Sequence, residues 1–335
     1  MKKLYFIVFA FLQIVTICNA QNKITIKGTI LKAESVGQIF ISTGDFLTSL
    51  DVSEDNTYAK EVDIPVLPTK ISLAGINMKT GKINYYTPDL WVESSEVELN
   101  IDLSKKNEYE LHPIMDDQSL SEQIQYADKK ERKQLIKQNS NSFPALYFLY
   151  NDYFFKESKD LAFLEDILAG LDQDYKESYY GKLLDTFLKA KKEIPVKKGK
   201  QLMPVELFNK DLKLTSLIQQ NNKKKIICYT STGCGYSKAS MAFLAELQIK
   251  IDIDKYEIIT VWDDSSYEIW QYHIPEIKNL IQWTNFWDRY RFTHTYLNID
   301  TTPTFFIVDE NNVLLKEMKG ISSKTKKELL KACNI

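Results

Sequence analysis

The chain has 335 residues, 44% of them hydrophobic, which is enough for two domains of ordinary size with buried cores. Its formal net charge is −2, so no overall positive field draws it to nucleic acid or to an anionic membrane surface. Tyr (19) and Phe (17) are frequent while Gly (11) is scarce, which excludes a disordered chain.

The first twenty residues have the pattern of an export signal. A basic start is followed by an apolar stretch at 4–17 and by small residues up to Ala20. We expect residues 1–20 to be cleaved, and the mature protein to be exported to the periplasm or cell envelope without a transmembrane segment. The stretch is shorter than the ~20 apolar residues of a membrane span, which disfavours a retained anchor. A lipoprotein signal acylated at Cys18 is disfavoured because Ile17 stands where a small residue is usual.

Cysteine usage favours a reactive thiol over a disulfide framework. Of the four cysteines, cleavage of the signal would remove Cys18 and leave Cys228, Cys234 and Cys333. An exported protein lies in an oxidising compartment, where cysteines tend to pair. Three sulfurs cannot all pair within one chain, so we expect a free reactive thiol.

Residues 21–115 are expected to form a small antiparallel β-sandwich. Apolar and polar residues alternate in several short segments, which is the period of strands with one buried face. These segments are separated by Gly, Pro, Asn and Asp turn residues, a spacing typical of sandwiches. They lie at 24–30, 38–42, 70–74, 91–93 and 97–101.

Residues 116–192 change to a helical period and are expected to form a helical segment. Ser142 followed by Pro144 predicts a helix start, and an apolar, aromatic run continues from there to 155. Further helices are predicted at 161–171 and 179–188. One stripe of aromatic residues could line a cofactor site, but packing against the β domain is the simpler interpretation. The stripe consists of Phe143, Tyr147, Tyr150 and Phe154.

Residues 193–201 are expected to be a linker, because they combine Pro, Gly and a lysine cluster with few apolar residues. We interpret the lysines as a solvated surface and not as a polyanion site.

Residues 202–335 alternate strands and helices. Continuous apolar runs at 225–230 and 256–262 are typical of strands covered on both faces. Helices are predicted at 238–247, 266–272, 287–296 and 322–333. Two further strands, at 304–308 and 313–315, flank a turn.

Two motifs in this part, about seventy residues apart, resemble a known family. One is the run 231–238, Ser-Thr-Gly-Cys-Gly-Tyr-Ser-Lys, directly after a predicted strand; the other is 299–309, which contains Thr302-Pro303 before an apolar strand. Together they resemble exported thioredoxin-like proteins of the TlpA/ResA type, within the thiol–disulfide oxidoreductase and AhpC-TSA-like redoxins. The resemblance implies an α/β thioredoxin-like domain over 202–335. The preceding β domain is similar to β domains of unknown function that often accompany it.

The resemblance also implies the site residues. Cys234 would be the nucleophile at a helix N-terminus. The family does not imply a role for Ser237, but its position one turn into that helix would let its hydroxyl donate a hydrogen bond to the Cys234 sulfur. Gly235 and Tyr236 would contact substrate. So would Thr302 and Pro303, with a cis bond between them and the Thr302 backbone beside a substrate strand. Protein thiols and disulfides would be the partners, together with an external reductant, and no cofactor or metal is implied.

Departures from the family's pattern fall on the site itself. The second cysteine of Cys-x-x-Cys is Ser237, Tyr236 replaces the usual proline, and the aromatic residues usual before Cys234 are absent. A serine cannot release a mixed disulfide, so an external thiol would have to do so. The alternative is a thioredoxin-fold module that has lost redox activity and binds an extended peptide or protein partner.

Other sites are less well supported. Cys-Gly-Tyr-Ser is similar to the motif of monothiol glutaredoxins, but those domains are shorter. Ile227 stands where a peroxidatic motif would have proline. Cys228 is expected in the core and Cys333 at the end of the last helix, so neither is expected to resolve a disulfide. The three histidines share no metal-ligand spacing.

Overall fold

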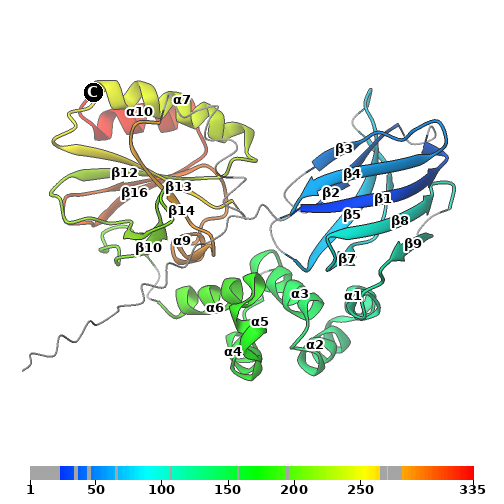
Figure 1. The fold of residues 1–335 in the computed structure, drawn as a ribbon. Coiled ribbons are helices and arrows are strands. Elements are labelled where there is room, and N and C mark those ends of the chain that lie inside the picture. The colour runs from blue at the N-terminus through cyan, green and yellow to red at the C-terminus, as the bar shows by residue number, and fades with distance from the viewer. Residues whose placement is uncertain are drawn as a thin grey trace, which may run out of the picture.

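The structure is a computed structural model that describes residues 23–33, 37–43, 47–64, 67–80, 82–105, 108–156, 158–193, 196–264, 270 and 281–335. The expected signal peptide lies outside the described residues, as does the predicted helix at 266–272 except for Trp270. A β domain, a helical segment and an α/β domain follow one another along the chain (Figure 1). Within the described part, no helix is both long enough and apolar enough to span a bilayer.

The N-terminal domain is the predicted sandwich of two sheets. The first sheet has the order β4-β1-β8-β9, with bounds Thr57–Asp63, Lys23–Leu31, Glu96–Asp102 and Tyr109–His112. The second has the order β3-β2-β5-β6, with β7 also paired to β5; the bounds are β3 Leu47–Leu50, β2 Gln38–Ser42, β5 Thr69–Asn77, β6 Lys82–Tyr86 and β7 Leu90–Val92. Alternate residues of both sheets, such as Ile26 and Leu73, form one shared core between them.

One strand pair differs from the antiparallel pattern expected of this domain. β1 and β8 run parallel, with Ile26 opposite Val97 and Ile30 opposite Ile101. Gly28 permits their close approach, because a Cβ there would lie 2.2 Å from the Leu99 carbonyl oxygen. Strand direction depends on partners distant in sequence, so the local alternation could not indicate it.

The helical segment contains six helices within the described residues: α1 Asp117–Tyr126, α2 Lys129–Gln138, α3 Phe143–Phe154, α4 Leu161–Gly170, α5 Gln173–Glu177 and α6 Tyr179–Lys192. The predicted start of α3 is confirmed, since Ser142 Oγ accepts a hydrogen bond from the Ala145 N–H at 3.3 Å. In Figure 1 these helices lie below the two sheet-containing domains and connect them.

The aromatic stripe of α3 packs against more than the β domain. Tyr147 does contact it, edge-to-face with Trp91 at 5.7 Å between ring centroids. Phe154 instead packs on Phe187 of α6, at 4.9 Å, and faces His294 of the α/β domain. The expectation was therefore right for Tyr147 and wrong for Phe154, which lies about two turns further along α3.

The C-terminal domain has one mixed sheet with the order β11-β10-β14-β13-β12-β15-β16. The bounds are β10 Glu206–Phe208, β11 Leu214–Ser216, β12 Lys224–Thr230, β13 Tyr256–Trp262, β14 Thr284–Trp287, β15 Thr304–Val308 and β16 Leu314–Lys319. Strands β12, β13 and β14 are parallel, and β15 and β16 are antiparallel to their neighbours.

Helices cover both faces of this sheet. α7 (Gly235–Lys250) and α10 (Ser323–Ala332) share a core with Ile226 and Cys228 on one face. α9 (Phe292–Tyr296) packs over Ile227 and Tyr229 on the other. This is the thioredoxin-like arrangement that the resemblance implied.

The predicted helix at 287–296 is wrong in its first half. Trp287 ends β14, where it is paired with Trp262, and α9 begins only at Phe292. Asp288 separates the two elements, because its carboxylate accepts hydrogen bonds from the Phe292 and His294 N–H groups. Strands β10 and β11 were also not predicted.

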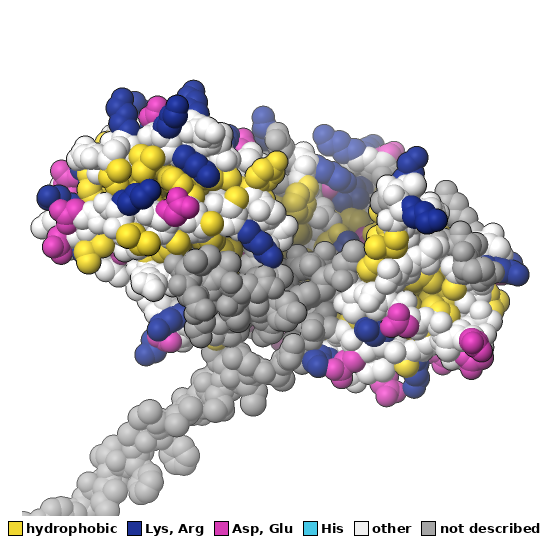
Figure 2. Space-filling model, turned by 90° about the horizontal axis from the view of Figure 1, so that it is seen from above, with side chains coloured by type: hydrophobic (Ala, Val, Ile, Leu, Met, Phe, Trp, Pro, Cys, Tyr) yellow, Lys and Arg dark blue, Asp and Glu magenta, His cyan; other side chains and the backbone are white. Residues whose placement is uncertain are grey.

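The described part of the expected linker is attached to the α/β domain. The Gly199 N–H donates to the Leu314 carbonyl at 2.8 Å, and the Leu314 N–H donates to the Lys200 carbonyl at 2.9 Å. The lysines of this stretch are exposed, as expected. Figure 2 shows basic and acidic side chains interspersed on both domains, in keeping with the small net charge.

Candidate functional site

The two motifs found in the sequence meet at one edge of the α/β sheet. β12 ends at Thr230, and Cys234 is the N-cap residue of α7. The Cys234 sulfur lies 3.5 Å from the carbonyl oxygen of Thr302, to which its S–H can donate. The Thr302–Pro303 peptide bond is cis, as the resemblance implied.

Ser237 lies beneath Cys234, inside the first turn of α7. It is buried, and its Oγ accepts a hydrogen bond from Thr230 Oγ1 at 2.5 Å. Because the threonine donates, the serine hydrogen is free to donate in turn to the Cys234 sulfur. A chain of two hydrogen bonds thus runs from the end of β12 to the thiol.

The environment lowers the pKa of Cys234 below the ordinary value of a thiol. Burial raises this pKa, but it is outweighed by hydrogen bonds from the Ser237 hydroxyl and from the Tyr236 N–H, with smaller contributions from Thr302 and the Ser237 N–H. The helix N-terminus acts in the same direction, because its N–H groups stabilise negative charge. The thiol is therefore placed where its thiolate is favoured.

The other predicted site residues surround the sulfur without covering it. Pro303 is buried and Thr302 half-buried, on the side of β15. Gly235 is exposed, and an added Cβ there would meet no atom within 4 Å. Tyr236 is 69% exposed, so its ring lies in solvent beside the site. The four positions form an open rim around Cys234.

The two other described cysteines are placed differently. Cys228 is fully buried in the core beneath α7, and burial raises its pKa strongly. Cys333 is 5% exposed, and burial raises its pKa to about 11. Neither is in a state that favours attack on a disulfide at neutral pH.

Asp264 supports the loop before Cys234 and was not singled out from the sequence. Its Oδ1 accepts hydrogen bonds from the Thr232 N–H at 3.0 Å and from Thr232 Oγ1 at 2.7 Å. The position of Asp264 in the sequence could have indicated this role, because Asp263 and Asp264 directly follow β13, a buried strand parallel to β12. Carboxyl ends of parallel strands meet at one edge, so these residues belong beside the loop that follows β12.

A buried polar cluster under α9 was also missed. Asp288 is 2% exposed, and its Oδ2 accepts a hydrogen bond from the Tyr229 hydroxyl at 3.2 Å. Arg291 lies 3.7 Å from Asp263 and donates to the Tyr150 hydroxyl of α3 at 3.1 Å. This cluster joins the helical segment to the edge of the sheet that carries the site.

Among the described residues, no three His, Cys, Asp or Glu side chains are grouped as metal ligands. His112 lies in β9 and His294 in α9, on different domains, while His273 is outside the described residues.

No family model matches this sequence, and no curated protein matches it either. Solved structures similar to part of the chain include thiol:disulfide interchange protein DsbE from Chlorobium tepidum, with 18% identity and a TM-score of 0.38, covering 41% of this chain and 95% of that one. Another is the thioredoxin domain of a thiol-disulfide oxidoreductase from Bacteroides vulgatus, with 15% identity, a TM-score of 0.37, and coverage of 42% and 99%. StoA from Bacillus subtilis has 16% identity, a TM-score of 0.33, and coverage of 39% and 97%.

Likenesses this distant carry no argument about activity. The fold itself follows from the strand order, the helices on both faces and the cis bond at Pro303. The C-terminal domain has a thioredoxin-like fold.

Proposed function

We propose that this protein is a thiol–disulfide oxidoreductase of the cell envelope in which Cys234 is the only nucleophile. The observation that carries the proposal is the position of its sulfur, at the N-terminus of α7 and 3.5 Å from the residue before a cis proline. The export signal expected at 1–20 is the reason for the proposed location.

The first step needs only Cys234. Its thiolate attacks one sulfur of a substrate disulfide, forming a Cys234–substrate disulfide and breaking the original S–S bond. The second substrate sulfur leaves as a thiolate and takes a proton from water. A thiolate is favoured at Cys234 by the hydrogen bond from Ser237, which therefore has a catalytic role although it cannot attack sulfur.

The second step needs a thiol from outside the protein. A small thiol, a reductase cysteine or a substrate cysteine attacks the mixed disulfide, forms a new disulfide with the substrate sulfur and returns Cys234 as thiolate. Cys228 and Cys333 are unsuited to this role, because both are buried and their pKa values are raised. The two steps together exchange one substrate disulfide for another. Net reduction of the substrate disulfide requires two external thiols.

Substrate would lie along the open rim as an extended peptide. We assign Thr302 and Pro303 to one side of it, and Gly235 and Tyr236 to the other. The exposed Tyr236 ring offers apolar contact, and the absence of a side chain at Gly235 leaves room for a peptide backbone.

The rate of alkylation of Cys234 by iodoacetamide, measured against pH with site-resolved mass spectrometry, tests the proposal. The expected pKa is below about 8.5, the value of a free thiol, and denatured protein should return to that value. A folded-state pKa at or above about 8.5 would remove the basis for an activated nucleophile.

A comparison of the wild type with Cys234→Ala separates this function from peptide binding without chemistry. With a disulfide-containing peptide, wild type should form an adduct that dithiothreitol releases, and the variant should form none. Equal retention of the peptide by both proteins would favour the binding module instead.

A further inference from the structure

The helical segment makes a polar contact with the α/β domain at Arg291. The guanidinium of this residue donates a hydrogen bond from Nη1 to the Tyr150 hydroxyl of α3 at 3.1 Å. An aromatic pair from the same two parts of the chain, Tyr179 and Tyr290, also meets, with 6.2 Å between the ring centroids. The Arg291 side chain is 22% exposed, so its hydrogen bond to Tyr150 is largely shielded from water.

Arg291 also faces the end of a strand beside the site. Its Nη2 lies 3.7 Å from Oδ2 of Asp263, which directly follows β13 and whose side chain is 9% exposed. Removing one partner of an ion pair so shielded from water leaves the other charge uncompensated, which destabilises its present position. The position of the Asp263 carboxylate therefore depends on Arg291.

Asp263 and Asp264 hold the stretch of chain that leads from β12 to Cys234. The Asp263 N–H donates to the Thr230 carbonyl at 3.1 Å, and Asp264 Oδ1 accepts a hydrogen bond from the Thr232 N–H at 3.0 Å. Thr230 and Thr232 are both buried and both precede Cys234 closely in the chain. Both ends of this stretch are therefore tied to the two aspartates.

The backbone of Arg291 is strained. Its φ is 54° and its ψ 32°, in the left-handed region that residues other than glycine rarely adopt. Such a conformation persists where the surrounding structure fixes it, and it is frequent at functional sites. Here the Arg291 N–H donates to the Asp288 carbonyl at 3.0 Å, and the Arg291 carbonyl accepts from the Thr295 N–H at 3.1 Å. The backbone is thus fixed with the guanidinium between Tyr150 and Asp263.

We propose that Arg291 is a positioning residue for Cys234 and that Tyr150 acts through it, so that the helical segment controls the reactivity of the thiol. Arg291 acts by holding Asp263 and, through the adjoining Asp264, the loop that precedes Cys234. Because it concerns the same thiolate, this role of Arg291 rests on the proposed function.

Two variants remove the two contacts of the guanidinium in turn. Arg291→Met removes the charge but keeps a long side chain. Tyr150→Phe removes only a hydroxyl, because its ring packs on Phe154 and Phe155 in either form. The rate of alkylation of Cys234 by iodoacetamide, measured against pH on the full chain, gives the pKa of the thiol in each variant.

We expect Arg291→Met to raise the pKa of Cys234, because Asp263 loses its counter-charge and the loop before the thiol loses support. Alkylation at pH 7 should slow by about threefold or more, within the range of couplings carried by packed networks. Tyr150→Phe should act in the same direction and more weakly. The double variant should match Arg291→Met alone, since residues that act through one another do not have additive effects. Fully additive effects would overturn the proposal.

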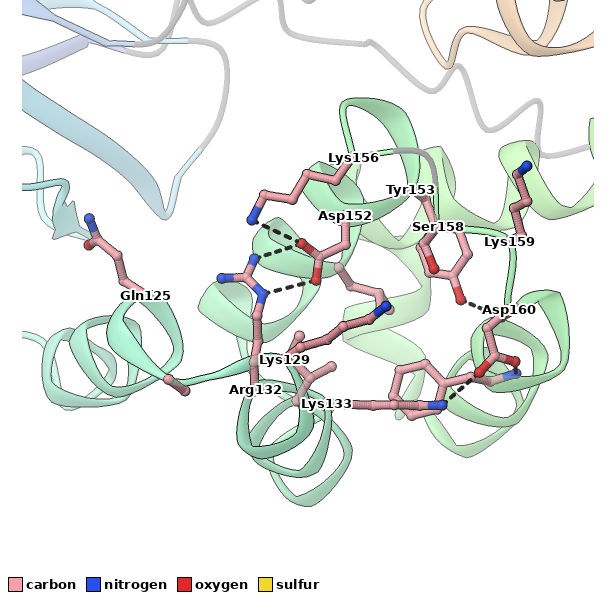
Figure 3. Close-up of a pocket in the computed structure, with 14 residues that line it drawn as sticks. Gln125, Lys129, Arg132, Lys133, Asp152, Tyr153, Lys156, Ser158, Lys159 and Asp160 are labelled. Carbon is pink, nitrogen blue, oxygen red and sulfur yellow. Dashed lines mark hydrogen bonds and ion pairs between the residues drawn. The ribbon is translucent and has the colours of Figure 1, made fainter.

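Arg132→Met is the matched control for the loss of an arginine from a shielded ion pair. Figure 3 shows Arg132 of α2 paired with Asp152 of α3, with 2.9 Å between Nη2 and Oδ1, inside the helical segment. The Arg132 side chain is 11% exposed. Its loss should lower the free energy of unfolding, as that of Arg291 should, but the pKa of Cys234 should stay at the wild-type value.

A purely structural role for Arg291 predicts the wild-type pKa of Cys234 in every variant, and that result would overturn the proposal. So would an equal rise of this pKa in Arg132→Met. If Arg291→Met does not fold, Tyr150→Phe decides alone, and an unchanged pKa in that variant is the contrary result. Failure of the proposed function is distinguishable, because it would appear as a pKa at or above about 8.5 in the wild type itself.

Discussion

Thr230 Oγ1 donates a 2.5 Å hydrogen bond to Ser237 Oγ, both side chains are buried, and the Ser237 hydroxyl in turn contacts Cys234. The position that holds the second cysteine in a Cys-x-x-Cys site is therefore occupied by an oriented hydroxyl. Its hydrogen is directed to the sulfur because its oxygen already accepts one from threonine. This position therefore holds no resolving thiol, and its hydroxyl is instead a donor that favours the thiolate of Cys234.

Replacing Thr230 by valine should raise the pKa of Cys234. Without its donor partner, the Ser237 hydroxyl can turn away from the sulfur, and the loss of a hydrogen bond of about 0.5–1.5 kcal/mol corresponds to at most ~1 pKa unit. The pH dependence of alkylation measures this change. Thr230→Ser, which keeps the hydroxyl, should keep the wild-type pKa of Cys234. Thr260→Val, a buried threonine of β13 whose hydroxyl contacts Asn285, should leave the Cys234 pKa unchanged.

Asp264→Ala should lower both the stability of the protein and the reactivity of the Cys234 thiol. It removes the acceptor for the Thr232 N–H and hydroxyl, and leaving these buried donors unpaired should cost about 1–3 kcal/mol in the free energy of unfolding. Alkylation of Cys234 should slow, because the loop before it loses its support. Urea unfolding and alkylation rates test the two effects. Asp254→Ala, at an exposed position after α7, is the control and should change neither.

His294 should make the fold sensitive to acid. Burial lowers the pKa of His294 to about 4, and the positive charges of Arg291 and Lys191 act in the same direction, while Asp300 opposes them. The folded protein therefore disfavours the imidazolium. His294 contributes to the free energy of unfolding above about pH 6.5, the pKa of histidine in the unfolded chain. This contribution, up to about 3 kcal/mol, is lost as the pH falls towards 4.

Asp288 makes the free energy of unfolding change with pH in the opposite direction. Variants are therefore needed to isolate the contribution of His294. Burial raises the pKa of Asp288 to about 6, and its contribution is lost as pH rises from about 4 to 6. We expect the difference in unfolding free energy between wild type and His294→Gln to shrink as pH falls from 7 to 4. His112→Gln, at an exposed strand position, should follow the wild-type profile. If the difference in unfolding free energy between wild type and His294→Gln stays constant from pH 7 to 4, the assignment of this acid sensitivity to His294 is contradicted.

Ser237→Cys should convert the site into one that resolves its own adducts. The introduced thiol would lie one helical turn from Cys234 and could attack a mixed disulfide, leaving an internal disulfide to Cys234 and free substrate. Thiol counting and peptide mapping after treatment with a disulfide peptide would detect the internal bond. Ser237→Ala, of similar size but without a thiol, should retain the adduct. Retention of the adduct by Ser237→Cys as well would show that the geometry does not permit resolution.

The sequence predicted the elements whose residues repeat a simple pattern. The apolar runs of β12 and β13, the capped start of α3 and the spacing of Cys234 from Pro303 all indicated structures that the chain forms. Burial on both faces of a strand requires such runs, so local sequence was sufficient there.

What the sequence did not predict depends on contacts between distant residues. β14 is short and begins with Thr284 and Asn285, which resemble a loop until they pair with β13. Thr230 is the last residue of an apolar strand, and nothing local distinguishes it from a core threonine. Its role depends on Ser237 one turn into α7, and that of Asp264 on the neighbouring strand.

The most direct test of the proposed function is the intact mass of the reduced protein after reaction with an excess of a peptide that is joined by a disulfide to a separate small thiol, so that the leaving thiol is not tethered to the adduct. We predict a single adduct at Cys234 that persists after the excess peptide is removed and disappears when glutathione or dithiothreitol is added. Cys234→Ala should give no adduct. Absence of the adduct in wild type, or its spontaneous release with formation of an internal disulfide to Cys228 or Cys333, would contradict the claim that Cys234 is a nucleophile resolved from outside.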